Sequence, residues 1–87
     1  MILHVTDVQY LQNYQLKLTF NDGVAGIVDL SNELWGEMFE PLKDPVLFSQ
    51  VRLDKDLDTI VWANGADLAP EFLHNLIQHV QEETHVQ

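Results

Sequence analysis

The stretch YQLKLTFNDG, residues 14–23, decides the fold of this chain. Leu16, Leu18 and Phe20 alternate with polar residues, and this period of two is typical of a strand that buries one face. The Asn-Asp-Gly sequence that follows favours a tight turn between antiparallel strands. The stretch therefore predicts one arm and the turn of a β-hairpin.

Further strands are predicted on both sides of this arm. Residues 2–11 are rich in β-branched and aromatic side chains and predict an N-terminal strand, which Asn13 ends in a turn. Residues 24–30 predict the returning strand, in which Gly26 indicates a bulge or a close packing contact.

A second hairpin is predicted in the later half of the chain. Residues 51–54 and 59–62 form its arms, and residues 55–58 join them. With the N-terminal strand and the first hairpin, this gives an antiparallel sheet of about five strands.

Two short helical turns are predicted between the hairpins. Ser31 is a candidate cap for a turn that ends at Gly36. Asp44 and Pro45 form a second start signal, with aspartate as the N-cap and proline at the first helical position. That second turn is expected to pack on the sheet through Val46, Leu47 and Phe48.

The C-terminal segment predicts one amphipathic helix that begins at Pro70. Its apolar residues form a single stripe, namely Phe72, Leu73, Leu76, Ile77 and Val80. Because this stripe needs a cover, we expect the helix to pack on the sheet. The expected core joins Leu16, Leu18 and Phe20 to Phe72, Leu76 and Ile77. Residues 1–87 are thus predicted to form a single α+β domain, with residues 80–87 as a frayed tail.

The composition excludes several classes of function. Fourteen acidic residues stand against four basic ones, for a formal net charge of −10. Direct nucleic-acid binding requires clustered lysine and arginine, and is not expected. The lack of cysteine excludes disulfides, thiolate metal sites and a cysteine nucleophile. We expect no association with membranes, because no apolar run approaches the roughly 20 residues of a membrane helix. Residues 1–5 do not resemble a signal peptide, so a cytoplasmic location is expected.

Two stretches of the sequence resemble a known family. They are residues 20–30, with Phe-Asn-Asp-Gly and Val-Asp-Leu, and residues 60–73, Ile-Val-Trp-Ala-Asn-Gly-Ala-Asp-Leu-Ala-Pro-Glu-Phe-Leu. With Pro41, Leu42 and Phe48, they resemble the domain-of-unknown-function family 2442, although Ala63 stands where proline is frequent. The resemblance implies a small bacterial α+β domain without established catalytic residues. It also implies that some members are paired with a second small protein, as in toxin–antitoxin operons.

The candidate binding residues are Trp62, Asn64, Asp67 and Trp35. Trp62 could present an aromatic anchor to a partner, with Asn64 and Asp67 as polar contacts. The same residues also fit a structural role, with Trp62 in the core, Asn64 in a turn and Asp67 near a helix start. Trp35, together with Met38 and Phe39, predicts an apolar patch through which the chain could form a homodimer.

Two patterns resemble metal sites, and both are incomplete. Asp54, Asp56 and Asp58 alternate as in a calcium loop but lack its glycine and its final glutamate. Glu71 and His74 have the Glu-x-x-His spacing of carboxylate-bridged metal sites, which require a second copy. We therefore expect no metal and no cofactor.

The sequence favours a protein-interaction or regulatory module over an enzyme, because it lacks a phosphate-binding loop and a nucleophile motif. The most specific form of this interpretation is an antitoxin-like partner of a small basic protein, which the acidic surface would attract. The alternative is a small-molecule-binding or sensor domain that uses a groove near Trp62 and the N-terminus of the last helix.

Overall fold

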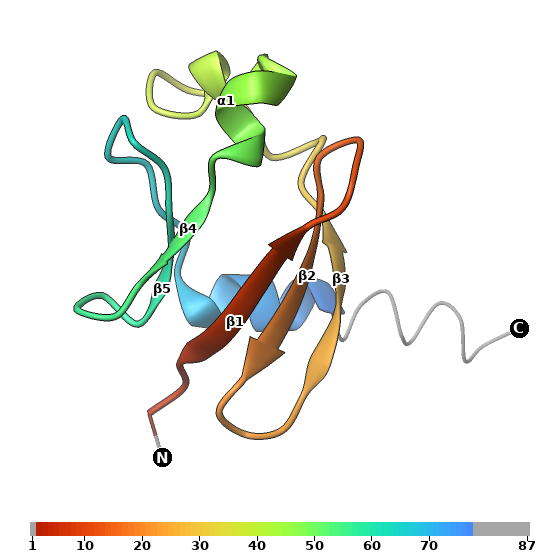
Figure 1. Ribbon diagram of the computed structural model, residues 1–87, viewed down its shortest axis with the longest axis vertical. Coiled ribbons are helices and arrows are strands. Elements are labelled where there is room, and N and C mark those ends of the chain that lie inside the picture. Colours follow the sequence, from red (N-terminus) through yellow and green to blue (C-terminus); the bar gives the residue numbers. More distant parts are fainter. Residues whose placement is uncertain (1, 78–87) are drawn as a thin grey trace, which may run out of the picture.

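A computed structural model of the protein describes residues 2–77. They form a three-stranded antiparallel sheet, a two-stranded sheet, short helical turns and a helix that begins at Pro70 (Figure 1). The predicted α+β class and the strands of both hairpins are confirmed. The expected frayed tail and Val80 lie outside the described residues.

The three-stranded sheet has the order β1-β2-β3, with β1 at Val5–Tyr10, β2 at Gln15–Phe20 and β3 at Ala25–Asp29. The predicted turn between β2 and β3 forms because Gly23 adopts a φ of 89°, which side chains disfavour. The Gly23 N–H donates to the Phe20 carbonyl at 3.1 Å, and the Asp22 carboxylate accepts from the Val24 N–H at 3.0 Å. The hairpin register thus follows from the local sequence.

The second sheet pairs β4 at Arg52–Asp54 with β5 at Thr59–Val61. The five strands are therefore divided between two sheets instead of forming one continuous sheet. β1 lies beside the second sheet, and the Val5 N–H donates to the Asp58 carbonyl at 3.0 Å. An irregularity in β1 between Val5 and Asp7 interrupts its pairing at this junction.

The segment between the sheets contains η1 at Glu40–Lys43 and α1 at Pro45–Ser49. The predicted N-cap is confirmed, because the Asp44 carboxylate accepts from the Val46 N–H at 2.9 Å. Phe48 is buried, but Val46 and Leu47 are exposed, so one residue of this turn packs into the core.

The prediction of a helical turn after Ser31 is wrong. Residues 31–36 form turns and bends without helix. The Asp29 carboxylate accepts from the Ser31 N–H at 2.9 Å, so a local side-chain bond takes the place of a helical cap.

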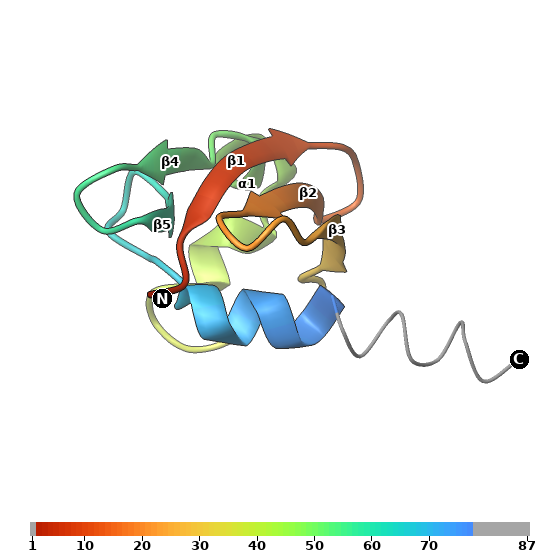
Figure 2. The same cartoon turned by 90° about the horizontal axis from the view of Figure 1, so that it is seen from below.

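The C-terminal helix lies across one face of the three-stranded sheet, as predicted (Figure 2). Leu73 and Ile77 are its buried residues within the described part, and Leu76 is partly buried. Phe72, by contrast, is 37% exposed, so its assignment to the core is wrong. Consecutive helical residues are separated by about 100°. Phe72 is therefore rotated away from the sheet when Leu73 and Ile77 face it.

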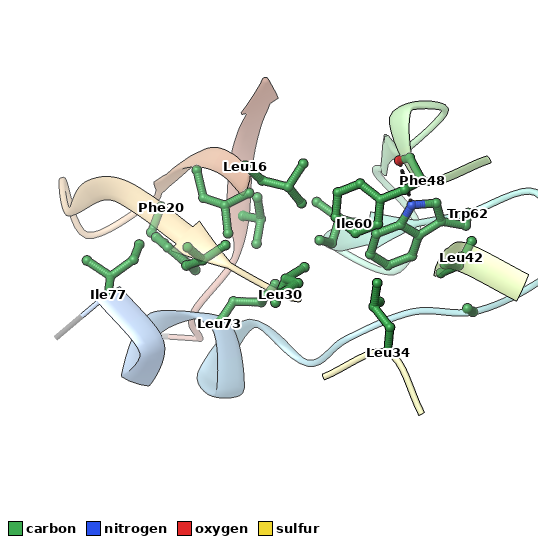
Figure 3. Packing of buried hydrophobic residues seen from close by; sticks show 14 residues of the cluster. Leu16, Phe20, Leu30, Leu34, Leu42, Phe48, Ile60, Trp62, Leu73 and Ile77 are labelled. Carbon is green, nitrogen blue, oxygen red and sulfur yellow. Dashed lines mark hydrogen bonds between the residues drawn. The ribbon is translucent and has the colours of Figure 1, made fainter. Parts of the chain in front are cut away.

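One continuous core joins the two sheets, α1 and the C-terminal helix (Figure 3). Its largest buried side chains lie in or next to β2, β3, α1, β5 and the C-terminal helix: Trp62, Phe20, Phe48, Leu16, Leu18, Leu30, Ile60, Leu73, Ile77 and Val28. Residues 2–77 thus behave as one packed unit, and any functional site lies on its surface.

Candidate functional site

Trp62 lies in the core and does not present its ring to a partner. Its side chain is 2% exposed, and the indole N–H donates to the Phe48 carbonyl at 3.0 Å (Figure 3). The Phe48 ring packs against the indole with 5.6 Å between ring centroids. The interpretation of Trp62 as a core residue is therefore confirmed.

Asn64 and Asp67 lie on the turn and bridge that follow Trp62. The Asn64 amide donates to the Met38 carbonyl at 2.8 Å and accepts from the Ala66 N–H at 3.1 Å. Gly65, with a φ of 91°, completes this turn. Asp67 forms a backbone bridge with Val61 and keeps an exposed side chain. Asn64 therefore fastens the turn to the Met38 segment, and Asp67 contributes charge to the surface.

The hollow beside Trp62 is small. It has a volume of about 40 Å³ and is lined by Pro41, Leu42, Leu47, Gln50, Trp62, Ala63 and Asn64. That volume accommodates a few water molecules, whereas small-molecule sites commonly span roughly 300–1,000 Å³. The geometry at Trp62 therefore gives no support to the sensor alternative.

Trp35, in contrast, is 71% exposed and borders an open groove of about 270 Å³. The groove is lined by Glu33, Trp35, Phe39, Leu68 and Phe72. It combines an exposed indole with further apolar side chains from two distant segments. Of the four predicted binding residues, Trp35 alone lines this groove.

The backbone on either side of Trp35 is held firmly. Leu34 is buried in the core, and Gly36 adopts a φ of 88° that lets the chain turn directly after the indole. The Gly36 carbonyl accepts from the N–H groups of Phe39 and Glu40, at 3.2 and 2.9 Å. The exposed indole therefore projects from a fixed turn.

Phe39 connects the groove to the core. Its ring meets the buried Trp62 ring edge-on, with 6.2 Å between centroids and 81° between planes. This arrangement is favourable for aromatic pairs. The groove thus rests on the core, and Trp62 supports the site from below instead of forming it.

Glu33, Leu68 and Phe72 are the groove-lining residues that the sequence analysis did not single out. Phe72 belongs to the apolar helical stripe, and periodicity alone assigned it to the core. The stripe contains two adjacent pairs, Phe72-Leu73 and Leu76-Ile77, and is therefore wider than the face that the sheet covers. This excess width was the available signal that one edge of the stripe faces another surface.

The surroundings of the groove are acidic. Glu33 lines it, and Glu37, Asp67 and Glu71 are exposed residues next to its lining segments. The four basic residues of the chain, Lys17, Lys43, Arg52 and Lys55, lie outside both lining segments. Residues 18–42 and 56–77, which supply every lining residue, contain no lysine or arginine. The groove therefore has four apolar lining residues and one lining carboxylate, Glu33, and further acidic residues adjoin its lining segments in the sequence.

The metal-like patterns have local structural roles. The Asp54 carboxylate accepts from the N–H groups of Asp56 and Leu57, at 2.8 and 3.1 Å, and shapes the β4–β5 turn. His74 Nε2 lies 2.9 Å from Asp22 Oδ2 and ties the helix to the β2–β3 turn. Within residues 2–77, no three histidine, aspartate or glutamate side chains gather in a way that could hold a metal ion.

Within the described part of the chain, no helix has both the length and the apolar character needed to cross a membrane.

Searches of curated proteins and of solved structures found no match to the sequence or the fold. A family model described as "Protein of unknown function (DUF2442)" matches residues 5–79, most of the chain. The predicted resemblance is thereby confirmed, and the chain belongs to the DUF2442 family.

Proposed function

We propose that this domain is a protein-interaction module that binds a basic partner protein in the groove beside Trp35. The observation that carries this proposal is the 71% exposure of the Trp35 side chain above an open groove of about 270 Å³. Tryptophan is enriched among the residues that dominate binding energy at protein interfaces. A fixed turn that holds an indole in water is therefore in keeping with a binding role.

The shape of the groove supports a protein partner. Its apolar residues Trp35, Phe39, Leu68 and Phe72 come from two separate segments and form a shallow surface beside the core. Interfaces between proteins have such apolar centres with polar rims. An apolar side chain of the partner would enter the groove and become buried against the indole and Phe72.

The charge distribution supports a basic partner. The chain carries a formal net charge of −10, and Glu33 lies in the groove itself. Complementary charge accelerates association and disfavours partners of like charge. The partner segment should therefore carry lysine or arginine next to the apolar residue that enters the groove.

An antitoxin-like role is the sharpest form of this proposal. In it, the partner is a small basic protein, as the gene pairing implied by the family resemblance suggests. In this role, the groove with its apolar residues and its acidic Glu33 is the surface that would contact the partner.

Affinity capture from native lysate tests the proposed function. The wild-type chain should retain a protein in which lysine and arginine outnumber acidic residues. Trp35→Ala should lose this protein, whereas Leu57→Ala should retain it, because Leu57 is 53% exposed and lies outside the groove. Equal retention by all three baits, or selective capture of an acidic protein, would contradict the proposal.

A further inference from the structure

The outer edge of β3 is a second surface with backbone groups that no described strand pairs. In the order β1-β2-β3, strand β3 has a neighbour on one side only. The opposite edge strand, β1, lies beside β4 and β5. Among the described strands of this sheet, β3 therefore offers the open edge (Figure 1).

The hydrogen-bond pattern identifies which backbone groups point outward. The Phe20 N–H donates to the Val24 carbonyl, and the Leu30 N–H donates to the Tyr14 carbonyl, each at 2.9 Å. Residues of an antiparallel strand alternate between facing the paired strand and facing away. Val24, Gly26, Val28 and Leu30 therefore bond toward β2. The N–H and C=O groups of Ala25, Ile27 and Asp29 point outward, and none of them bonds to another backbone group within residues 2–77.

This edge lacks several of the features by which proteins prevent strand pairing, namely lysine, proline and bulges. β3 reads Ala-Gly-Ile-Val-Asp, pairs with β2 in unbroken register and exposes Ile27 to 48%. From beneath, the Ile77 side chain packs closely on Gly26. The edge is therefore a regular template that is fixed in place.

We propose that the outer edge of β3 pairs with an extended, basic segment of the partner protein, which adds a fourth strand to the sheet. This inference rests on the proposed function, because it assigns a second contact to the same partner. An added strand gains affinity from backbone hydrogen bonds and specificity from alternate side chains. An apolar residue of the segment would lie opposite Ile27, and a lysine or arginine would lie opposite Asp29.

Charge selects a basic segment over a second copy of this chain. Asp29 is the exposed last residue of β3, and Asp22 lies in the β2–β3 turn, where its carboxylate is 2.9 Å from His74 Nε2. Lys17 is the cross-strand partner of Ile27 and the one basic residue of β2. The Ser31 N–H lowers the pKa of Asp29, which is therefore charged at neutral pH. A second copy would bring another net charge of −10, whereas a basic segment would offset the negative charge of this chain.

Amide hydrogen exchange with the capped peptide Lys-Thr-Val-Thr-Lys tests this pairing, because its first, third and fifth residues share one face and can place valine opposite Ile27 and lysine opposite Asp29. At low salt, the peptide should slow exchange at Ala25, Ile27 and Asp29 by at least about tenfold. The same peptide with its valine and both lysines N-methylated on the backbone should give no protection, because it cannot form the ladder. The peptide Glu-Thr-Val-Thr-Glu should fail as well. No protection by the lysine peptide at millimolar concentration, or equal protection by the glutamate peptide, would overturn the proposal.

Two variants make the test specific. Ile27→Pro removes only an outward N–H, which an edge strand tolerates, and should fold but lose the protection. Ile27→Thr keeps that N–H and should remain protected. If Ile27→Pro does not fold, the comparison with the N-methylated peptide replaces this variant as the test of strand addition. Protection of Ala25 and Asp29 that persists in a folded Ile27→Pro chain would count against strand addition.

Two further readings separate this inference from its alternatives. Trp35→Ala should leave the peptide-dependent protection unchanged, so failure of the groove and failure of the edge are distinguishable. In the absence of peptide, the edge amides should remain unprotected at every chain concentration. Protection that rises with chain concentration in the absence of peptide would overturn the proposal in favour of a second copy.

Discussion

The side chain of Ile77 packs directly against the backbone of Gly26. A Cβ atom at Gly26 would stand 2.9 Å from Ile77 Cγ2, closer than such atoms approach. This contact joins β3 to the C-terminal helix, and it explains a glycine that the sequence marked as a bulge or close contact. We predict that Gly26→Ala lowers the free energy of unfolding by about 1–3 kcal/mol, the usual cost of overpacking.

A double-mutant cycle with Ile77→Ala checks the cause of that loss. This change removes Cγ2, the Ile77 atom nearest the new methyl group, so the double variant should lose less stability than the two single losses added together. Urea unfolding provides the measurement. Simple additivity would contradict the proposed contact.

The helix should be far more sensitive at Leu73 than at Phe72. Leu73 is fully buried, so Leu73→Ala should cost about 2–5 kcal/mol in urea unfolding. Phe72 is 37% exposed, and Phe72→Ala should cost clearly less. A larger loss at Phe72 than at Leu73 would show that the helix is rotated relative to the orientation described.

Asp22 should make the stability of the domain depend on pH in the acidic range. Its pKa lies below the ordinary value of 3.8, first because of the Val24 N–H and also because of His74. A lowered pKa in the folded state stabilises the fold above the pKa of the unfolded chain, and this contribution is lost as pH falls through the folded pKa. Asp22→Asn should therefore be less stable than wild type at pH 7, and the difference should shrink below pH 3.8. Urea unfolding at several pH values measures it, and a difference that does not change with pH would refute this role.

Local sequence predicted the hairpins and the α1 cap well, because each depends on neighbouring residues. Asp44 caps α1 through its own side chain, and Gly23 permits the turn by its own conformation. The division of the strands into two sheets depends on how β1 meets β4 and β5, which no local pattern encodes.

The candidate site was predicted less completely, for a related reason. Composition cannot distinguish the buried tryptophan from the exposed one, because both have apolar neighbours in the sequence. Trp62 can be buried because the Phe48 carbonyl accepts a hydrogen bond from its indole N–H. Trp35 stays exposed because it lies between buried Leu34 and the turn at Gly36. Both outcomes depend on segments that are distant in the sequence or on a backbone conformation.

Reversal of the charge that lines the groove should slow association with the partner. Glu33→Lys places a positive charge in the groove lining, and the expected result is a lower association rate with a weaker dependence on ionic strength. Asp56→Lys is the matched control, because it makes the same change of charge in the β4–β5 turn, outside the groove-lining residues. Stopped-flow measurements from about 0.05 to 0.5 M salt would reveal the difference. Equal rates for both variants would mean that net charge, and not the charge in the groove, governs association.

The most direct test of the groove is the dissociation constant of the purified partner for wild-type and Trp35→Ala chains, with Leu57→Ala as the folded control. A central aromatic residue of an interface contributes about 2 kcal/mol or more, so Trp35→Ala should weaken binding by roughly 30-fold or more. Leu57→Ala should bind like wild type. If Trp35→Ala binds within about threefold of wild type, which corresponds to less than about 0.7 kcal/mol, the partner does not use this groove.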